Sequence, residues 1–294
     1  MTFVPFLDYA HRDRLRAVLA EYGARLCDFT LISLFMWAPL FKTAIAEEDG
    51  RIFIRAEDPT GGEEFYVLPY MGEAFFAAVS AVSRHTGGGI RLDGVPEREI
   101  LALRKRYGEG IAVTTDPAES DYLYEIGNLA TYAGRRYSQK RNHVNAFLRE
   151  HGGAVYEPIT EENLPAVRAF FDTYRREEEK DSPSAHAEGA AVVRVLEEFF
   201  DLSAEGGLLR EGDRILGFFV GEVQGDTLYL HIEKATRAVR GAYPYLVQCA
   251  AKAYADRVRY ENREEDDGDE GLRQSKHSYC PCALLEKYRV YLSP

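Results

Sequence analysis

The sequence predicts a mixed α/β fold built from two related units in tandem. Strand patterns separated by turns come first, and helices and strands then alternate, as in a mixed α/β domain. A basic helical pattern over residues 138–151 ends at Gly152 and Gly153, and a similar succession of elements then begins again. The length of 294 residues is long for one core and sufficient for two. We therefore expect an N-terminal domain over residues 1–151 and a C-terminal domain over residues 152–294.

Apolar spacing and turn residues assign the individual elements. In the first half we expect helices over residues 13–22, 72–85, 96–107 and 138–151, and strands over residues 43–47, 51–56, 63–68, 89–92, 111–115 and 122–126. In the second half we expect helices over residues 160–180, 185–202, 241–256 and 268–276, and strands over residues 207–211, 214–224, 227–234, 258–262 and 284–292.

Composition and charge exclude several classes of protein. The net charge of −12 argues against a general nucleic-acid binder, because non-specific affinity depends on neutralising phosphates with Lys and Arg, although it leaves room for a local basic patch. We expect no DNA partner. The longest apolar run, residues 29–41, is too short to span a bilayer and has no basic region before it. We therefore expect a cytoplasmic protein without integral membrane association; its oligomeric state stays open.

Cysteines and acidic residues suggest metal sites only superficially. Cys27 and Cys249 stand singly in apolar surroundings, as buried thiols do. His277, Cys280 and Cys282 lack the usual two-residue spacer and a fourth ligand. The acids of residues 264–270 are contiguous, whereas a calcium loop alternates its ligands. We expect no metal site and no tightly bound cofactor.

Four motifs carry a family resemblance. They are Tyr-Leu-Tyr-Glu-Ile at residues 122–126, Lys-Arg-Asn-His at residues 140–143 with Phe147, His-Ile-Glu-Lys-Ala at residues 231–235 with Gly241-Ala-Tyr243, and the charged stretch 262–273 with Lys276. Together they resemble a bacterial family related to the C-terminal domain of phosphatidylglycerol lysyltransferase. The resemblance implies two tandem GNAT-like acyltransferase units, each a mixed central sheet flanked by helices. It also implies an ancestry shared with enzymes that move aminoacyl groups from tRNA to lipid or peptidoglycan precursors.

Two basic or glycine-containing segments are candidates for binding the donor. Lys140, Arg141 and His143 lie on one helix and offer the donors that suit a phosphate, although they could equally pair with the protein's own carboxylates. In a GNAT enzyme, the turn before the following helix cradles a pyrophosphate. This chain has Arg240, Gly241 and Tyr243 there, with one glycine, which suits a donor other than acetyl-CoA.

The expected catalytic residues are Glu233, His231 and Asp266. His231 and Glu233 alternate with apolar residues along a strand, so we expect them to share a face and to serve acid–base chemistry. The alternative is that Glu233 only forms an ion pair with Arg263, Arg273 or Lys276. The expected substrate-binding residues are Asn262, Glu264, Arg273 and Lys276.

The resemblance implies an acyl or aminoacyl transferase, and these residues place its expected site in the C-terminal unit. The donor would be a CoA thioester or an aminoacyl-tRNA, and the acceptor an amine or hydroxyl on a small or lipid-like molecule. The competing interpretation is a non-catalytic module that binds a ligand or tRNA and keeps the fold, since fold does not guarantee chemistry.

Overall fold

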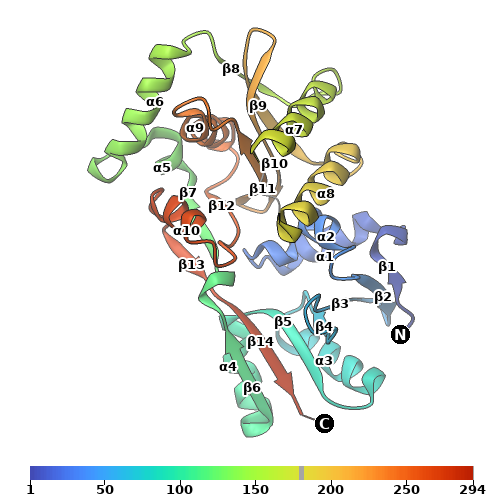
Figure 1. The fold of residues 1–294 in the computed structure, drawn as a ribbon. Helices are drawn as coiled ribbons and strands as arrows, with labels where there is room; N and C mark the ends of the chain where they lie inside the picture. The colour runs from blue at the N-terminus through green and yellow to red at the C-terminus, as the bar shows by residue number, and fades with distance from the viewer. Residues whose placement is uncertain (179–181, 294) are drawn as a thin grey trace. The chain divides into compact units, whose positions relative to one another are not determined.

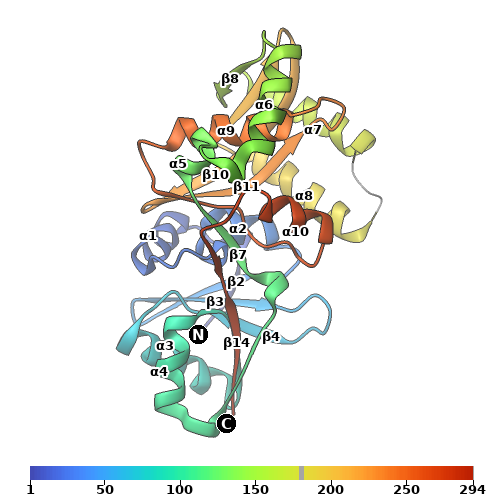
Figure 2. The ribbon, with the colours of Figure 1, turned by 90° about the vertical axis from the view of Figure 1, so that its left-hand side faces the viewer.

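The computed structural model describes residues 1–178 and 182–293. Their contacts divide the chain into two compact units (Figures 1 and 2). Unit 1 comprises Met1–Asp121, Glu265–Gly268 and Leu284–Pro294, and unit 2 comprises Tyr122–Glu264 and Asp269–Ala283. Each unit contains one mixed seven-stranded sheet flanked by helices, so the predicted fold class is confirmed.

The sheet of unit 1 has the strand order β1-β2-β3-β4-β5-β14-β6. Its strands are β1 (Val4–Pro5), β2 (Ala44–Glu48), β3 (Arg51–Glu57), β4 (Glu64–Val67), β5 (Ile90–Pro96), β6 (Ile111–Thr115) and β14 (Lys287–Leu292). Its helices are α1 (Arg12–Tyr22), α2 (Leu31–Trp37), α3 (Gly72–Thr86) and α4 (Glu97–Tyr107). β14 lies between β5 and β6 and is antiparallel to both, so the end of the chain completes the first sheet (Figure 1).

The sheet of unit 2 has the strand order β13-β7-β12-β11-β10-β9-β8. Its strands are β7 (Asp121–Glu125), β8 (Val155–Pro158), β9 (Glu205–Glu211), β10 (Arg214–Gln224), β11 (Thr227–Ala235), β12 (Tyr260–Asn262) and β13 (Ala283–Leu285). Its helices are α5 (Ile126–Thr131), α6 (Ser138–Glu150), α7 (Leu164–Glu178), α8 (Pro183–Glu197), α9 (Ala242–Tyr254) and α10 (Glu270–His277). β11 and β12 are parallel, whereas β8 to β11 form an antiparallel meander.

Adjacent residues of β10 identify the two faces of this sheet. Phe218 packs against Phe171 of α7, with ring centroids 6.0 Å apart. Phe219 packs against Tyr254 of α9, with centroids 6.2 Å apart. Because successive strand residues point to opposite faces, α7 and α9 cover opposite sides of the sheet. We call these the α7 face and the α9 face.

The path of the chain differs from the expected division at residue 151. Unit 2 begins at Tyr122, because β7 joins the second sheet beside β12 while α5 and α6 contact α9. The strand expected over residues 284–292 is two strands, and β14 belongs to unit 1 rather than to the C-terminal half. The expected end of the helix 160–180 lies outside the described residues. The sequence also gave no sign of α2, α5 or β8, which are short and lack a clear period.

Candidate active site

The polar residues of unit 2 gather where β11 and β12 stop pairing. The parallel pairing joins Thr227–Tyr229 to Tyr260–Asn262, but β11 continues to Ala235. Beyond the last backbone pairing, side-chain contacts connect β11 with the segment that follows β12. Glu264 contacts His231, and Arg263 contacts Glu233.

A β-bulge at His231 separates the two residues that we expected to act together. The ladder pairs Val220 with Ile232 and Gly221 with Leu230, so His231 is an extra residue on β11. Glu233 lies opposite Phe219 and therefore on the α9 face. His231 lies on the other side with Glu222, so the expectation that His231 and Glu233 share a face was wrong. The bulge reverses the alternation on which that expectation rested.

His231 forms a fully bonded cluster on the α7 face. Its Nδ1 lies 2.7 Å from Glu264 Oε1, and its Nε2 lies 3.2 Å from Glu222 Oε1. Burial alone would lower the pKa of His231, but the two glutamates outweigh it and raise the pKa to about 9. The ring is therefore an imidazolium at neutral pH and cannot accept a proton. Asn262 supports the cluster, because its Oδ1 accepts a hydrogen bond from the Glu264 backbone N–H at 2.7 Å.

Glu233 forms a second cluster on the α9 face. Its Oε2 accepts a hydrogen bond from Arg263 Nη2 at 2.5 Å. Of the partners considered for Glu233, Arg263 is therefore the one that binds it. Arg263 also lies near Glu261 of β12, with Nε 3.8 Å from Oε1. Lys276 fixes the backbone beside this pair, because its Nζ donates to the carbonyl oxygens of Arg263 at 2.6 Å and Glu264 at 3.1 Å.

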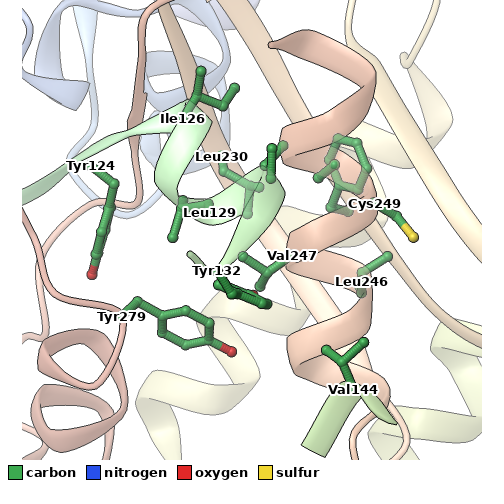
Figure 3. Packing of buried hydrophobic residues seen from close by; sticks show 14 of the residues in the cluster. Tyr124, Ile126, Leu129, Tyr132, Val144, Leu230, Leu246, Val247, Cys249 and Tyr279 are labelled. Atoms are coloured by element: carbon green, nitrogen blue, oxygen red, sulfur yellow. The ribbon is translucent and has the colours of Figure 1, made fainter. Parts of the chain in front are cut away.

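Aromatic side chains surround the second cluster. Figure 3 shows Tyr124, Tyr132 and Tyr279 in the apolar core that α9 forms with the sheet. The Arg263 guanidinium lies 4.6 Å from the centre of the Tyr279 ring, and Lys140 Nζ lies 3.3 Å from the same centre. Burial and, secondarily, Arg263 lower the pKa of Lys140 to about 7. Lys140 Nζ therefore lies against the Tyr279 ring of the core, whereas a lysine that binds phosphate at the surface would extend into solvent.

The expected donor-binding turn is closed by packing. Gly241 has φ of 86° and precedes α9. A Cβ at Gly241 would overlap the carbonyl oxygen of His143 and touch Phe147, so this glycine admits helix α6 rather than a phosphate. Arg141 bonds to the carbonyl oxygens of Tyr132 and Gly134.

The remaining donor candidates lie in different surroundings. Tyr243 is directed to the α7 side, with its hydroxyl 3.2 Å from that of Tyr174. Arg240 is exposed, and it and Lys140 add to the burial that lowers the pKa of His143. Arg240 therefore supplies an exposed positive charge near Lys140 and His143, whose lowered pKa values reduce their own charge, and Arg141 is bonded elsewhere.

Two expected site residues are not brought to these clusters. Asp266 belongs to unit 1, where its Oδ1 accepts a hydrogen bond from the Gly268 backbone N–H at 3.0 Å. Arg273 pairs with Glu270 on its own helix, at 3.3 Å. The catalytic role of Asp266 and the substrate-binding role of Arg273 therefore remain predictions.

Sequence reasoning missed Glu222 and Glu261 as parts of the site. Glu222 lies within the longest strand of the meander, and Glu261 lies between Tyr260 and Asn262 on a three-residue strand. A charged residue inside an apolar strand is the signal that could have identified both, since unpaired charges are costly to bury.

One group of the described residues has the spacing of metal ligands, and it lies in unit 1. Ligand atoms of Cys27, Asp121 and Glu265 lie within 4.8 Å of one another. Lys287 Nζ lies 3.1 Å from Cys27 Sγ, 2.8 Å from Asp121 and 3.0 Å from Glu265. The ammonium therefore fills the position that a cation would take.

The two mixed sheets, with an ionic cluster where β11 and β12 stop pairing, define a mixed α/β protein of two units. The chain belongs to the family described as phosphatidylglycerol lysyltransferase, C-terminal, whose model matches residues 23–291. This confirms the family resemblance.

Three individual proteins are similar to this chain. A crystal structure of a conserved protein of unknown function from Bacteroides thetaiotaomicron is 27% identical, covers 100% of both chains and has a TM-score of 0.87. The structure of L-PGS from Bacillus licheniformis is 14% identical, covers 95% of this chain and 91% of that chain, and has a TM-score of 0.62, which shows a shared fold. An uncharacterised protein of Mycoplasmoides gallisepticum is 27% identical over 203 residues, which is 68% of this chain; the match spans 64% of that relative's length.

Within residues 1–178 and 182–293, no helix combines the length and the apolar character needed to cross a bilayer.

Proposed function

We propose that unit 2 transfers an acyl or aminoacyl group, with Glu233 as the group that accepts the proton of the nucleophile. The donor is a CoA thioester or an aminoacyl-tRNA, and the acceptor is an amine or hydroxyl on a small or lipid-like molecule. Membership of a lysyltransferase-related family supports the transferase class.

The observation that carries the proposal is the Glu233–Arg263 pair beyond the last parallel backbone pairing. A carboxylate and a guanidinium, each 11% exposed, lie 2.5 Å apart at that point. A poorly solvated carboxylate can take up a proton, while the nearby guanidinium stabilises negative charge that develops on a carbonyl oxygen. Glu233 is preferred to His231, because the His231 ring is already protonated at neutral pH.

In the proposed step, the acceptor's amine or hydroxyl attacks the carbonyl carbon of the donor and gives its proton to Glu233. The bond from the carbonyl carbon to the donor sulfur or oxygen then breaks. That proton, or one from solvent, completes the leaving thiol or hydroxyl. In this proposal the exposed Arg240 attracts the phosphates of either donor, and Lys140 and His143 beside it supply further hydrogen-bond donors.

A non-catalytic binding module is the second candidate, and a specific observation favours it. Helix α6 packs on Gly241 and covers the turn that would cradle a pyrophosphate. Under this alternative Arg240 and the basic residues beside it bind tRNA or another phosphorylated ligand, and Glu233 and Arg263 only hold the strands together.

A two-stage experiment distinguishes the candidates. Thermal-shift screening of CoA thioesters and of aminoacyl-tRNAs identifies a donor, because a ligand specific to the folded state raises stability by mass action. Transfer from a labelled donor is then measured for the wild type and for Glu233→Gln. We expect the variant to fold and to lose turnover by about a hundredfold.

The matched control is Glu205→Gln. Glu205 also pairs with an arginine, Arg257, but this pair is more exposed. The control should keep wild-type turnover. Full activity of a folded Glu233→Gln would remove Glu233 from the chemistry, and donor binding without any transfer would favour the binding module.

A further inference from the structure

Glu261 is the most unusual acid of unit 2. It is completely buried on the central strand β12, between Leu228 of β11 and Tyr124 of β7. Neither of its carboxylate oxygens has a hydrogen-bond partner among the described residues. Buried carboxyl groups normally form hydrogen bonds, so Glu261 is an exception that needs a physical reason.

Arg263 has an unused donor beside it. Its Nη2 binds Glu233 at 2.5 Å, and its Nε lies 3.8 Å from Glu261 Oε1. Its Nη1 is buried and has no partner among residues 1–178 and 182–293. One guanidinium therefore lies between two carboxyl groups, bonded to one and close to the other.

The balance of charge in this cluster indicates which of the two carboxyl groups carries a proton. Arg263 and an ionised Glu233 already cancel, so a second buried carboxylate would be uncompensated. Burial raises the pKa of Glu261 to about 8, Arg263 opposes this and Glu233 reinforces it. Glu261 is thus a neutral acid at pH 7 in the free protein.

The groups that face Glu261 come from several elements. Tyr124 of β7, Tyr132 after α5 and Tyr279 after α10 interact with it electrostatically, as do Glu233 and Arg263. Lys140 of α6 acts on the cluster through Arg263 and Glu233. Among these groups, Arg263 alone has a buried donor that is left unbonded.

We propose that Glu261 is a positioning residue, the alternative ion-pair partner of Arg263 that frees Glu233 when a substrate occupies the site. This rests on the proposed function of Glu233. A carboxylate held by a guanidinium is a weak base, so Arg263 must release it before it can accept a proton. When Arg263 turns to Glu261, Glu261 loses its proton to solvent. A cationic group of the substrate beside Glu233 keeps the whole cluster neutral.

The exchange can be tested in the full chain without a substrate, because Glu233→Gln removes the partner of Arg263. Glutamate labelled with ¹³C at the side-chain carboxyl reports each titration by NMR and does not report Lys140. In the wild type, we expect one carboxyl to titrate near pH 8, and this signal to be absent from Glu261→Gln. In Glu233→Gln, we expect the midpoint of that carboxyl to fall by about one pH unit or more, a tenfold change in its acidity.

Glu205→Gln is the matched control and should leave the midpoint unchanged, because Glu205 pairs with Arg257. An unchanged midpoint in Glu233→Gln would overturn the proposal, as would the absence of a high-pH carboxyl in the wild type. Failure of Glu261→Gln to fold would also overturn it, since a neutral amide should replace a neutral acid. A shifted midpoint in a protein that transfers no group would keep the ion-pair exchange and reject the proposed function.

Discussion

Lys287 of unit 1 and Arg263 of unit 2 are both largely buried beside acids, and these two cations are bonded differently. In unit 1, Lys287 Nζ lies 2.9 Å from Asp28, 2.8 Å from Asp121 and 3.0 Å from Glu265. In unit 2, Arg263 makes one short bond to Glu233 and leaves Glu261 without a hydrogen bond. In the first cluster the ammonium contacts three carboxylates. In the second, Arg263 Nη1 and both carboxylate oxygens of Glu261 have no hydrogen-bond partner among the described residues.

This difference separates a structural cluster from a candidate site. A fully bonded buried network fixes one arrangement, because any movement breaks several bonds in a medium of low dielectric. A partly bonded network can adopt a second bonding pattern at little cost, but its unsatisfied polar groups lower the stability of the fold. We therefore assign the Lys287 cluster to folding and the Arg263 cluster to function, and the following predictions test that assignment.

The largest effect is expected for Lys287→Met. Removing the ammonium leaves Asp28, Asp121 and Glu265 with uncompensated charge, and breaking a buried ion pair from one side costs about 3–5 kcal/mol. The free energy of unfolding from urea denaturation measures this cost. Lys105→Met, on the exposed side of α4, is the control and should change stability by less than about 0.5 kcal/mol.

A loss below about 1 kcal/mol for Lys287→Met would contradict the assignment. Such a small loss would mean that the acids around Lys287 take up protons when the ammonium is removed, so that no uncompensated charge stays buried. Asp121 is the acid to examine in that case, because burial raises its pKa to about 7.

An intermediate effect is expected for His231→Gln, which tests a fully bonded cluster inside unit 2. The folded-state pKa of His231, about 9, lies above the ordinary value of 6.5. The stabilisation is therefore complete below about pH 6.5 and is lost as the pH rises through 9. The pKa difference corresponds to about 3 kcal/mol at most.

Unfolding curves at pH 6 and pH 10 measure this dependence. The difference in the free energy of unfolding between the wild type and His231→Gln should become smaller as the pH rises. A difference that is the same at both pH values would show that folding leaves the pKa of the ring at its ordinary value of 6.5. The ring would then be largely neutral at pH 7, and His231 would return as a candidate base.

The sequence predicted most elements and the family, but not the arrangement of the site. The period of apolar residues located β9, β10, β11 and α9 closely, because each is long enough to show its pattern. The extra residue at His231 carries no local signature, yet it decides that Glu233 faces α9. Bulges depend on the pairing of two strands, which a single pattern does not specify.

The division into units was also beyond the sequence, because it depends on pairing between distant segments. β14 enters the first sheet between β5 and β6, although it follows all of unit 2 along the chain. Likewise, the missing bonds of Glu261 appear only when every neighbour is placed. The residue types of a site can be predicted, whereas its unsatisfied atoms cannot.

The smallest effect at acidic pH is expected for Glu261→Gln. The amide resembles the protonated acid in shape and charge, so at pH 5 the free energy of unfolding should change by less than about 1 kcal/mol. Because the folded-state pKa of Glu261, about 8, exceeds the ordinary value of 4.5, the folded wild type binds the extra proton between these values. Wild-type stability relative to the variant therefore falls as the pH rises from 4.5 through 8, and Glu261→Gln should be the more stable protein at pH 9. Glu205→Gln should show no such gain at pH 9, since Arg257 lowers the pKa of Glu205 and the wild type keeps that pair. If Glu261→Gln were less stable than the wild type at pH 9, Glu261 would be an ionised partner of Arg263 in the resting protein, and Arg263 would be as fully bonded as Lys287.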